Sequence, residues 1–157
     1  MPGSELRWLD DIAGANMSYK RQAFHESGPF LEGTYCSDSD FHWRLGRDGH
    51  RLQFVPQIVV WHHSIDDLQE FLQHEFVHGR CFARVRSQGQ GFSRLRRLAY
   101  VLLSPVIPLK ILLKTVSNNI TNRVYLLHFL KALPLVALGV VSWSAGELVG
   151  YCGGWRG

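Results

Sequence analysis

Acidic residues are almost absent from the second half of this chain. Beyond Leu98 the only carboxylate side chain belongs to Glu147, whereas residues 1–97 hold nearly all of the Asp, Glu and His. The overall composition, 46% hydrophobic and 19% charged over 157 residues, is that of one modest globular domain, but it averages two unlike halves. The contrast indicates a polar N-terminal part and an apolar C-terminal part.

Two long apolar runs occupy the second half. Leu98 to Leu113 is interrupted by prolines and a lysine, and Val124 to Trp143 is interrupted by His128 and Lys131. A membrane-spanning helix needs about 20 mainly apolar residues, so each run is marginal. We expect either two imperfect transmembrane helices or a re-entrant or interfacial helical hairpin. A buried helical pair in a soluble protein is the third alternative.

Basic residues gather just before the apolar half. The net charge is +4 with His neutral, and the cluster consists of Arg80, Arg84, Arg86, Arg94, Arg96 and Arg97. It lacks the interleaved aromatic residues of a single-strand nucleic-acid reader, and it adjoins an apolar segment. Anionic lipid attracts such residues by about 1 kcal/mol each. We therefore expect a membrane partner and no nucleic acid, with the cluster on the cytoplasmic face.

The cysteines and the N-terminus bear on the compartment. Cys36, Cys81 and Cys152 are far apart, odd in number and form no CxxC pair, which argues against a disulfide framework and a zinc finger. The N-terminal stretch MPGSELRWLDD has no apolar segment of the kind found in signal peptides. Both features favour a reducing, cytosolic environment for the polar part.

Helical patterns occur in three places before the apolar half. Residues 20–27 predict a short helix that ends at Gly28. Residues 37–45 predict a second helix, capped by Ser37 or Ser39. Apolar residues at helical spacing predict a third helix, capped by Ser64 and interrupted or ended at Gly79.

Strand patterns surround Pro56. Residues 51–55 and 58–61 predict two short strands, the second because Val59, Val60 and Trp61 favour extended structure. An additional short apolar stretch, 12–17, is a candidate buried strand leading into a polar loop.

The stretch SDSDFHWRLGRDGH, residues 37–50, places two carboxylates in the first turn of its predicted helix. The helix dipole and free backbone amides favour negative charge there. Asp38 and Asp40 point about 200° apart around the helix, so they cannot serve one point together. Taken alone, Asp38 is most simply a cap and Asp40 a partner for Arg44.

The order of several segments adds a second interpretation. GANMSYKRQAF, GPF, SDSDFHWRL and GHRLQFVPQIVVWHH follow one another at spacings that resemble the C-terminal half of a family 2 glycosyltransferase catalytic domain, which is inverting and has the GT-A fold. The resemblance covers residues 12–86. The closing stretch GELVGY also resembles the tails of membrane-attached members. The resemblance implies an α/β fold: a partial GT-A-like domain over residues 1–92, followed by a C-terminal helical membrane-associated hairpin over residues 93–157.

The resemblance implies roles for individual residues. Asp38 corresponds to the general base that deprotonates the acceptor hydroxyl, although Ser37 stands where the family usually has Glu. Asp40 and Arg44 correspond to later helix residues that shape the acceptor site. Substrate binding is also implied for the loop of Gly14, Ala15 and Asn16.

Two more residues are implied around the leaving group. His62 corresponds to a strand-end histidine that approaches the metal or diphosphate in some relatives, and Arg80 lies where related synthases contact the diphosphate. The complete enzyme would use a divalent cation, Mg or Mn, with oxygen ligands. Its partners would be a nucleotide-sugar donor and a glycan or lipid-linked acceptor.

The nucleotide-binding strands and the Asp-x-Asp metal motif of such a domain are not found before Asp38, and the Asp10-Asp11 pair lies too near the start to supply them. We therefore expect an acceptor-side fragment that is inactive by itself. The alternative from another class is a non-catalytic membrane-associated interaction module, in which Asp38 only caps its helix.

Overall fold

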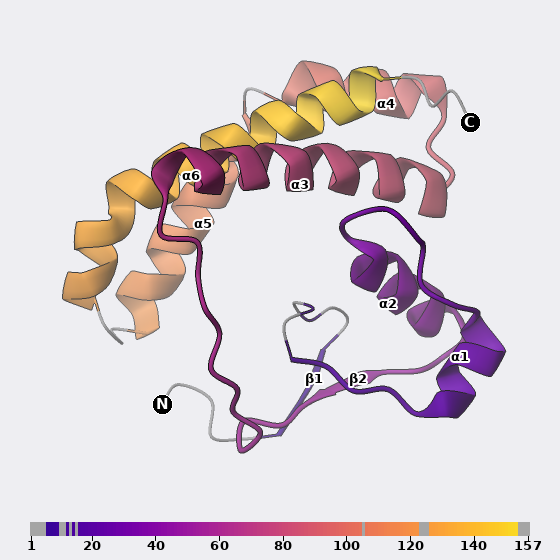
Figure 1. The fold of residues 1–157 in the computed structure, drawn as a ribbon. Helices are drawn as coiled ribbons and strands as arrows, with labels where there is room; N and C mark the ends of the chain where they lie inside the picture. Colours follow the sequence, from indigo (N-terminus) through magenta and orange to yellow (C-terminus); the bar gives the residue numbers. More distant parts are fainter. Residues whose placement is uncertain are drawn as a thin grey trace. The chain divides into compact units, whose positions relative to one another are not determined.

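The computed structural model of the chain describes residues 6–9, 12, 14, 16–104, 106–122 and 126–153. It divides into two compact units, Gly3–Ser64 and Ile65–Gly157. Figure 1 shows the elements of both. The functional division into residues 1–92 and 93–157 stays a prediction.

The first unit has two short helices and two short strands. Strand β1 (Arg7–Leu9) pairs antiparallel with β2 (Leu52–Phe54), so that Trp8 lies opposite Gln53. Helix α1 (Arg21–Ser27) ends as predicted at Gly28, whose positive φ of 78° suits glycine. Helix α2 (Ser37–Arg47) confirms the second predicted helix, but its N-cap is Cys36 rather than Ser37 or Ser39.

An aromatic cluster forms the interior of this unit. Phe41 on α2 is fully buried; it stacks on Phe24 of α1 at a ring-centroid distance of 4.9 Å and meets the edges of Tyr19 and Phe30 at about 5 Å. Aromatic pairs of this kind contribute about 0.5–1.5 kcal/mol each beyond their burial. Phe41 and Leu45 share the buried face of α2, as their spacing of four predicts.

The predicted strand at residues 58–61 is wrong. No strand within the described residues pairs with this segment, and its apolar side chains are exposed, Trp61 almost completely at 99%. Branched and aromatic residues favour strands because they pack on neighbouring strands, so the preference has no effect where no neighbour is present. The predicted α/β fold is likewise wrong. The described chain is mostly helical, and its sheet has two strands.

The second unit contains helices α3 (Leu68–Gly89), α4 (Arg94–Leu103), α5 (Ile107–Asn122) and α6 (Leu126–Cys152). The side chain of Asp67, not Ser64, caps α3 by accepting a hydrogen bond from the Glu70 amide at 2.7 Å. Ser93 caps α4 in the same way, through the Arg96 amide. These caps define where the two helices begin.

Helices α3 and α6 pack along each other in parallel (Figure 1). Successive glycines of α6, namely Gly139, Gly146 and Gly150, meet α3 at Phe71, Phe76 and Ala83 in turn. Added methyl groups at these positions would collide with α3, so the absence of side chains lets the two backbones touch. The prediction that Gly79 interrupts or ends this helix is therefore wrong. Gly79 lies inside α3, against the Trp143 carbonyl of α6.

The distribution of side chains on α6 is the reverse of that in an ordinary soluble helix. Small or polar residues face α3, and large apolar residues face outward, including Leu127, Leu130, Leu135, Leu138 and Val141. Helix α6 has 27 residues and is long and apolar enough to cross a membrane. Only 6% of its apolar 18-residue stretch is buried within the protein. Helices α4 and α5, bent by 64° at their junction, pass the same length and composition test together.

Candidate functional site

Asp38 is the second residue of α2 and is half-buried. Within the described residues its carboxylate makes no hydrogen bond or ion pair. The N-cap residue of α2, Cys36, makes no side-chain capping bond either. The carboxylate therefore lies at a helix N-terminus, where the dipole favours negative charge, without acting as the cap.

Gly14 lies directly against this carboxylate. A Cβ atom at Gly14 would be 2.5 Å from Asp38 Oδ2 and 3.2 Å from its Cγ, so a side chain at position 14 would make the Asp38 carboxylate move. Two residues that the sequence analysis assigned to one site are thus brought together by the fold of the first unit.

Cys36, which immediately precedes α2, has an unusual backbone conformation. Its φ is 62°, in the left-handed region that costs a residue with a side chain about 1–2 kcal/mol. The side chain is buried, with 6% of its surface exposed. Burial holds the strained turn in place, and that turn sets the direction in which Ser37 and Asp38 enter the helix.

Asn16, two residues after Gly14, lines a small cavity. Its amide nitrogen donates to the Ile58 carbonyl at 3.1 Å. A cavity of about 270 Å³ is lined by Asn16, Tyr19 and residues of β2. Asn16 therefore lines a cavity, as a substrate-binding loop residue should, whereas Ala15 and the Asp10-Asp11 pair lie outside the described residues.

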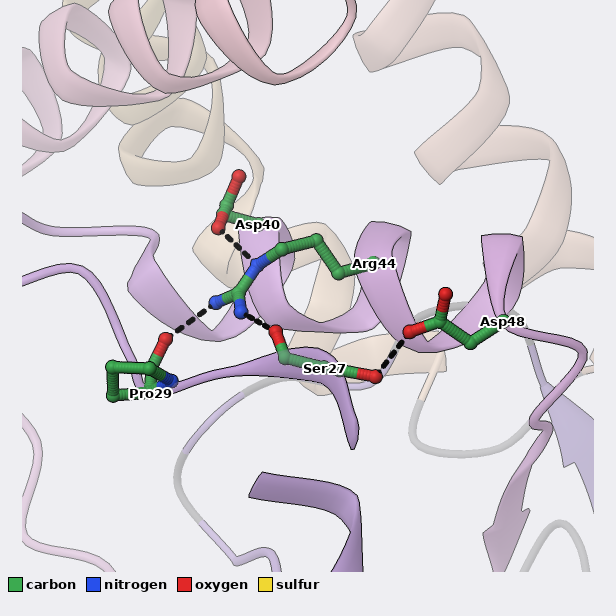
Figure 2. A network of polar contacts seen from close by, with 5 residues as sticks. All are labelled: Ser27, Pro29, Asp40, Arg44 and Asp48. Atoms are coloured by element: carbon green, nitrogen blue, oxygen red, sulfur yellow. Dashed lines mark hydrogen bonds and ion pairs between the residues drawn. The ribbon is translucent and has the colours of Figure 1, made fainter. Parts of the chain in front are cut away.

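Asp40 and Arg44 contact each other rather than open space. Arg44 Nε donates to Asp40 Oδ2 at 2.9 Å, and the rest of its guanidinium donates to the backbone carbonyls of Ser27 and Pro29 (Figure 2). The Ser27 hydroxyl in turn donates to Asp48 at the end of α2. The network joins the end of α1 and the following turn to α2, which is a positioning role for the helix that carries Asp38.

One buried pair was missed by the sequence analysis. The ring of His42 is 2% exposed, and its Nε2 lies 2.7 Å from the Tyr19 hydroxyl, which also borders the cavity. The only sequence signal was the position of His42 beside Phe41, on the edge of the buried face of α2. A histidine there is as easily a surface residue, so periodicity alone does not find the pair.

His62 and Arg80 lie in different parts of the chain. His62 is exposed in the irregular segment after β2. Arg80 is in α3, where its backbone nitrogen and carbonyl approach Gly146 and Gly150 of α6, and its Nε is buried with no hydrogen-bond partner among the described residues. No three His, Cys, Asp or Glu side chains of the described chain come together in a way that could hold a metal ion.

Comparisons with protein families, with curated proteins and with solved structures found no match.

Proposed function

We propose that this chain is the acceptor-side part of a membrane-attached inverting glycosyltransferase. The sugar would pass from a nucleotide-sugar donor to a hydroxyl of a glycan or lipid-linked acceptor. The observation that carries the proposal is the Asp38 carboxylate at the start of α2, which has no polar partner in the described chain and lies against the Gly14 backbone. Such a group is available to accept a proton.

The chemistry requires few groups from this part of the protein. Asp38 would take the proton from the acceptor hydroxyl as its oxygen attacks the anomeric carbon, while the bond to the nucleoside diphosphate breaks on the opposite face. Negative charge then develops on the leaving diphosphate, and a cationic side chain stabilises it. Arg80 is the candidate cation. Gly14 and Asn16 would border the acceptor, and Asp40 with Arg44 would hold α2 in place.

The divalent cation expected for a complete enzyme of this kind does not fit the described residues. Oxygen ligands for Mg²⁺ or Mn²⁺ would have to converge on one point, and no such group is found in the described part of the chain.

Membrane attachment is proposed through the outer surface of the second unit, on the cytoplasmic side. Helix α3 lies along α6 for most of its length and carries Glu75, Arg80 and Arg84. If α6 crossed the bilayer in this packing, those charges would enter the hydrocarbon at a cost of several kcal/mol. The charges on α3 therefore favour an interfacial position for the second unit, with the leucines of α6 in the lipid and arginines at the headgroups.

A non-catalytic membrane-associated module is the second candidate. It is favoured by one observation, the continuous exposed apolar surface of α4, α5 and α6. In that case the second unit alone supplies the activity, and Asp38 has no chemical role.

The two candidates are separated by replacing Asp38 with Asn in a full-length protein that also contains a nucleotide-binding half. Release of nucleoside diphosphate is measured with a panel of nucleotide sugars and a membrane lipid extract as acceptor. A general base contributes about 10²–10⁴-fold, so we expect kcat to fall by that factor while donor Kd changes little. Asp66→Asn, an exposed carboxylate outside the site, is the matched control.

Equal rates for wild type and Asp38→Asn would reject Asp38 as the base. Absence of transfer by the wild type with every donor, together with firm membrane binding, would favour the module.

A further inference from the structure

A second and larger cavity lies within the second unit. It has a volume of about 800 Å³, within the range of small-molecule sites, and all four helices α3 to α6 contribute to its lining. Most of the lining is apolar, with Ile107, Ile111, Val136, Val140 and Trp143 among the contributors. The cavity belongs to the second unit, whereas Asp38 belongs to the first.

Five charged side chains also line this cavity: Glu75, Arg86, Lys110, Lys114 and Glu147. Three positive and two negative charges leave one net positive charge on the wall. An anionic ligand would balance it, and the positions of the charges show where that ligand would bind.

Arg86, Glu147 and Glu75 each have a polar neighbour within the protein. Arg86 donates to the Tyr100 hydroxyl at 3.0 Å and lies over the Tyr100 ring at 4.8 Å. Glu147 is 4% exposed and accepts a hydrogen bond from the Tyr151 hydroxyl at 3.4 Å. Glu75 faces His74 at 3.5 Å.

Lys110 and Lys114 differ from the other charged groups. They are four residues apart on α5, so they lie on one face of a helix that is otherwise apolar in its first half. Neither has an ion-pair partner among the described residues. Like charges at this spacing destabilise a helix, and a bound anion would remove that repulsion.

We propose that this cavity binds one membrane lipid whose phosphate headgroup carries a net negative charge. Lys110 and Lys114 contact the phosphate, and the apolar wall takes the adjoining part of an acyl or prenyl chain. A free phosphate would use the lysines but leave the wall empty. The exposed leucines of α4, α5 and α6 bring the unit to a bilayer, where such lipids are abundant.

Trp143 supplies a direct reporter because it lines the cavity. The full chain is placed in detergent micelles with phosphatidylglycerol or phosphatidylcholine carrying brominated chains, which quench nearby tryptophan fluorescence. Subtracting the signal of Trp143→Phe isolates this residue. We expect phosphatidylglycerol to quench at a much lower mole fraction. In K110Q/K114Q its advantage falls about thirtyfold, since each lysine contributes about 1 kcal/mol and 1.4 kcal/mol is tenfold.

The control variant R94Q/K131Q removes the same charge outside the cavity and should keep the preference. K110R/K114R, which keeps both charges, should also keep it, and circular dichroism checks that every variant is helical. Equal quenching by the two lipids in the wild type would overturn the proposal. So would an equal loss in R94Q/K131Q, or full competition by soluble glycerol phosphate, which would indicate a headgroup site only.

Discussion

The two units of this protein are packed in different ways. The first unit buries Phe41 and Leu45, with Phe24 half-buried beside them, and holds the buried Asp40 by an ion pair to Arg44. The second unit has a core of Ala83, Phe92 and Tyr151, but glycines, Ser144 and Glu147 are buried on α6 and its leucines are exposed. Hydrophobic burial therefore contributes to both units, and close backbone packing between α3 and α6 adds to it in the second.

The difference shows which surroundings each unit is suited to. Large apolar side chains on the outside are unfavourable in water but cost nothing against lipid. Small residues between helices are of little use to hydrophobic burial but allow many close contacts. Helix α6 of the second unit is thus long and apolar enough to cross a membrane, and the packing of each unit can be tested separately.

The largest effect is expected at the α3–α6 contact. Gly146→Leu would drive a side chain into the backbone of Phe76 and Arg80 and push the helices apart. Overpacking at such a site costs about 3 kcal/mol. Urea unfolding in mild detergent, followed by circular dichroism, measures it. Val141→Leu on the exposed side of α6 should change stability by less than about 0.5 kcal/mol. Equal stability of the two variants would contradict the packing.

A smaller loss is expected in the first unit when Arg44 becomes Met. Asp40, 6% exposed, would lose its ion-pair partner, and the carbonyls of Ser27 and Pro29 would lose a donor. Leaving a buried charge unpaired costs about 2 kcal/mol in this partly exposed setting. Fluorescence of Trp43, on the same helix, follows the unfolding.

Arg44→Lys should lose less, because it keeps the charge but not the planar fork. Arg21→Gln, an exposed cation on α1, serves as the control and should be nearly neutral. An Arg44→Met variant with the same free energy of unfolding as the wild type would show that the network does not hold α1 and α2 together.

The smallest effect has the opposite sign. Gly46 lies inside α2 with open space where a Cβ would be, so Gly46→Ala should stabilise the first unit by about 0.5–1 kcal/mol. Gly28→Ala is the matched contrast, because its φ of 78° disfavours a side chain and the variant should be destabilised. Trp43 fluorescence during urea unfolding measures both. The same sign for both substitutions would contradict the helix geometry.

Helix positions were largely predictable from the sequence, and strands only in part. The strand predicted at residues 51–55 is confirmed by β2, whereas the one at residues 58–61 is wrong. Residues 20–27 and 37–45 carry local signals that act within a few residues, such as the glycine that ends α1. Residues 58–61 carry a strand preference that needs a distant partner, and no partner lies in the described chain. Gly79 was misread for a similar reason: its role depends on Trp143, which is 64 residues away.

The candidate site was predicted in part. Gly14, Asn16 and Asp38 were chosen from the order of segments, and the structure brings Gly14 and Asp38 into contact. The Tyr19–His42 pair and the strained turn at Cys36 had no sequence signal, because burial and a positive φ are properties of the folded chain. Asp38 as a base stays a prediction.

The sequence alone determined that a polar part precedes an apolar one, and that α6 is long and apolar enough to meet a membrane. Composition and helical period are local properties, so they survive without knowledge of the fold. Only the tertiary structure decided that Arg44 also binds the carbonyls of Ser27 and Pro29, that Asp38 is left without a partner in the described chain, and that glycines join α3 to α6. Those features depend on which residues meet across long separations, and no single stretch of sequence specifies that.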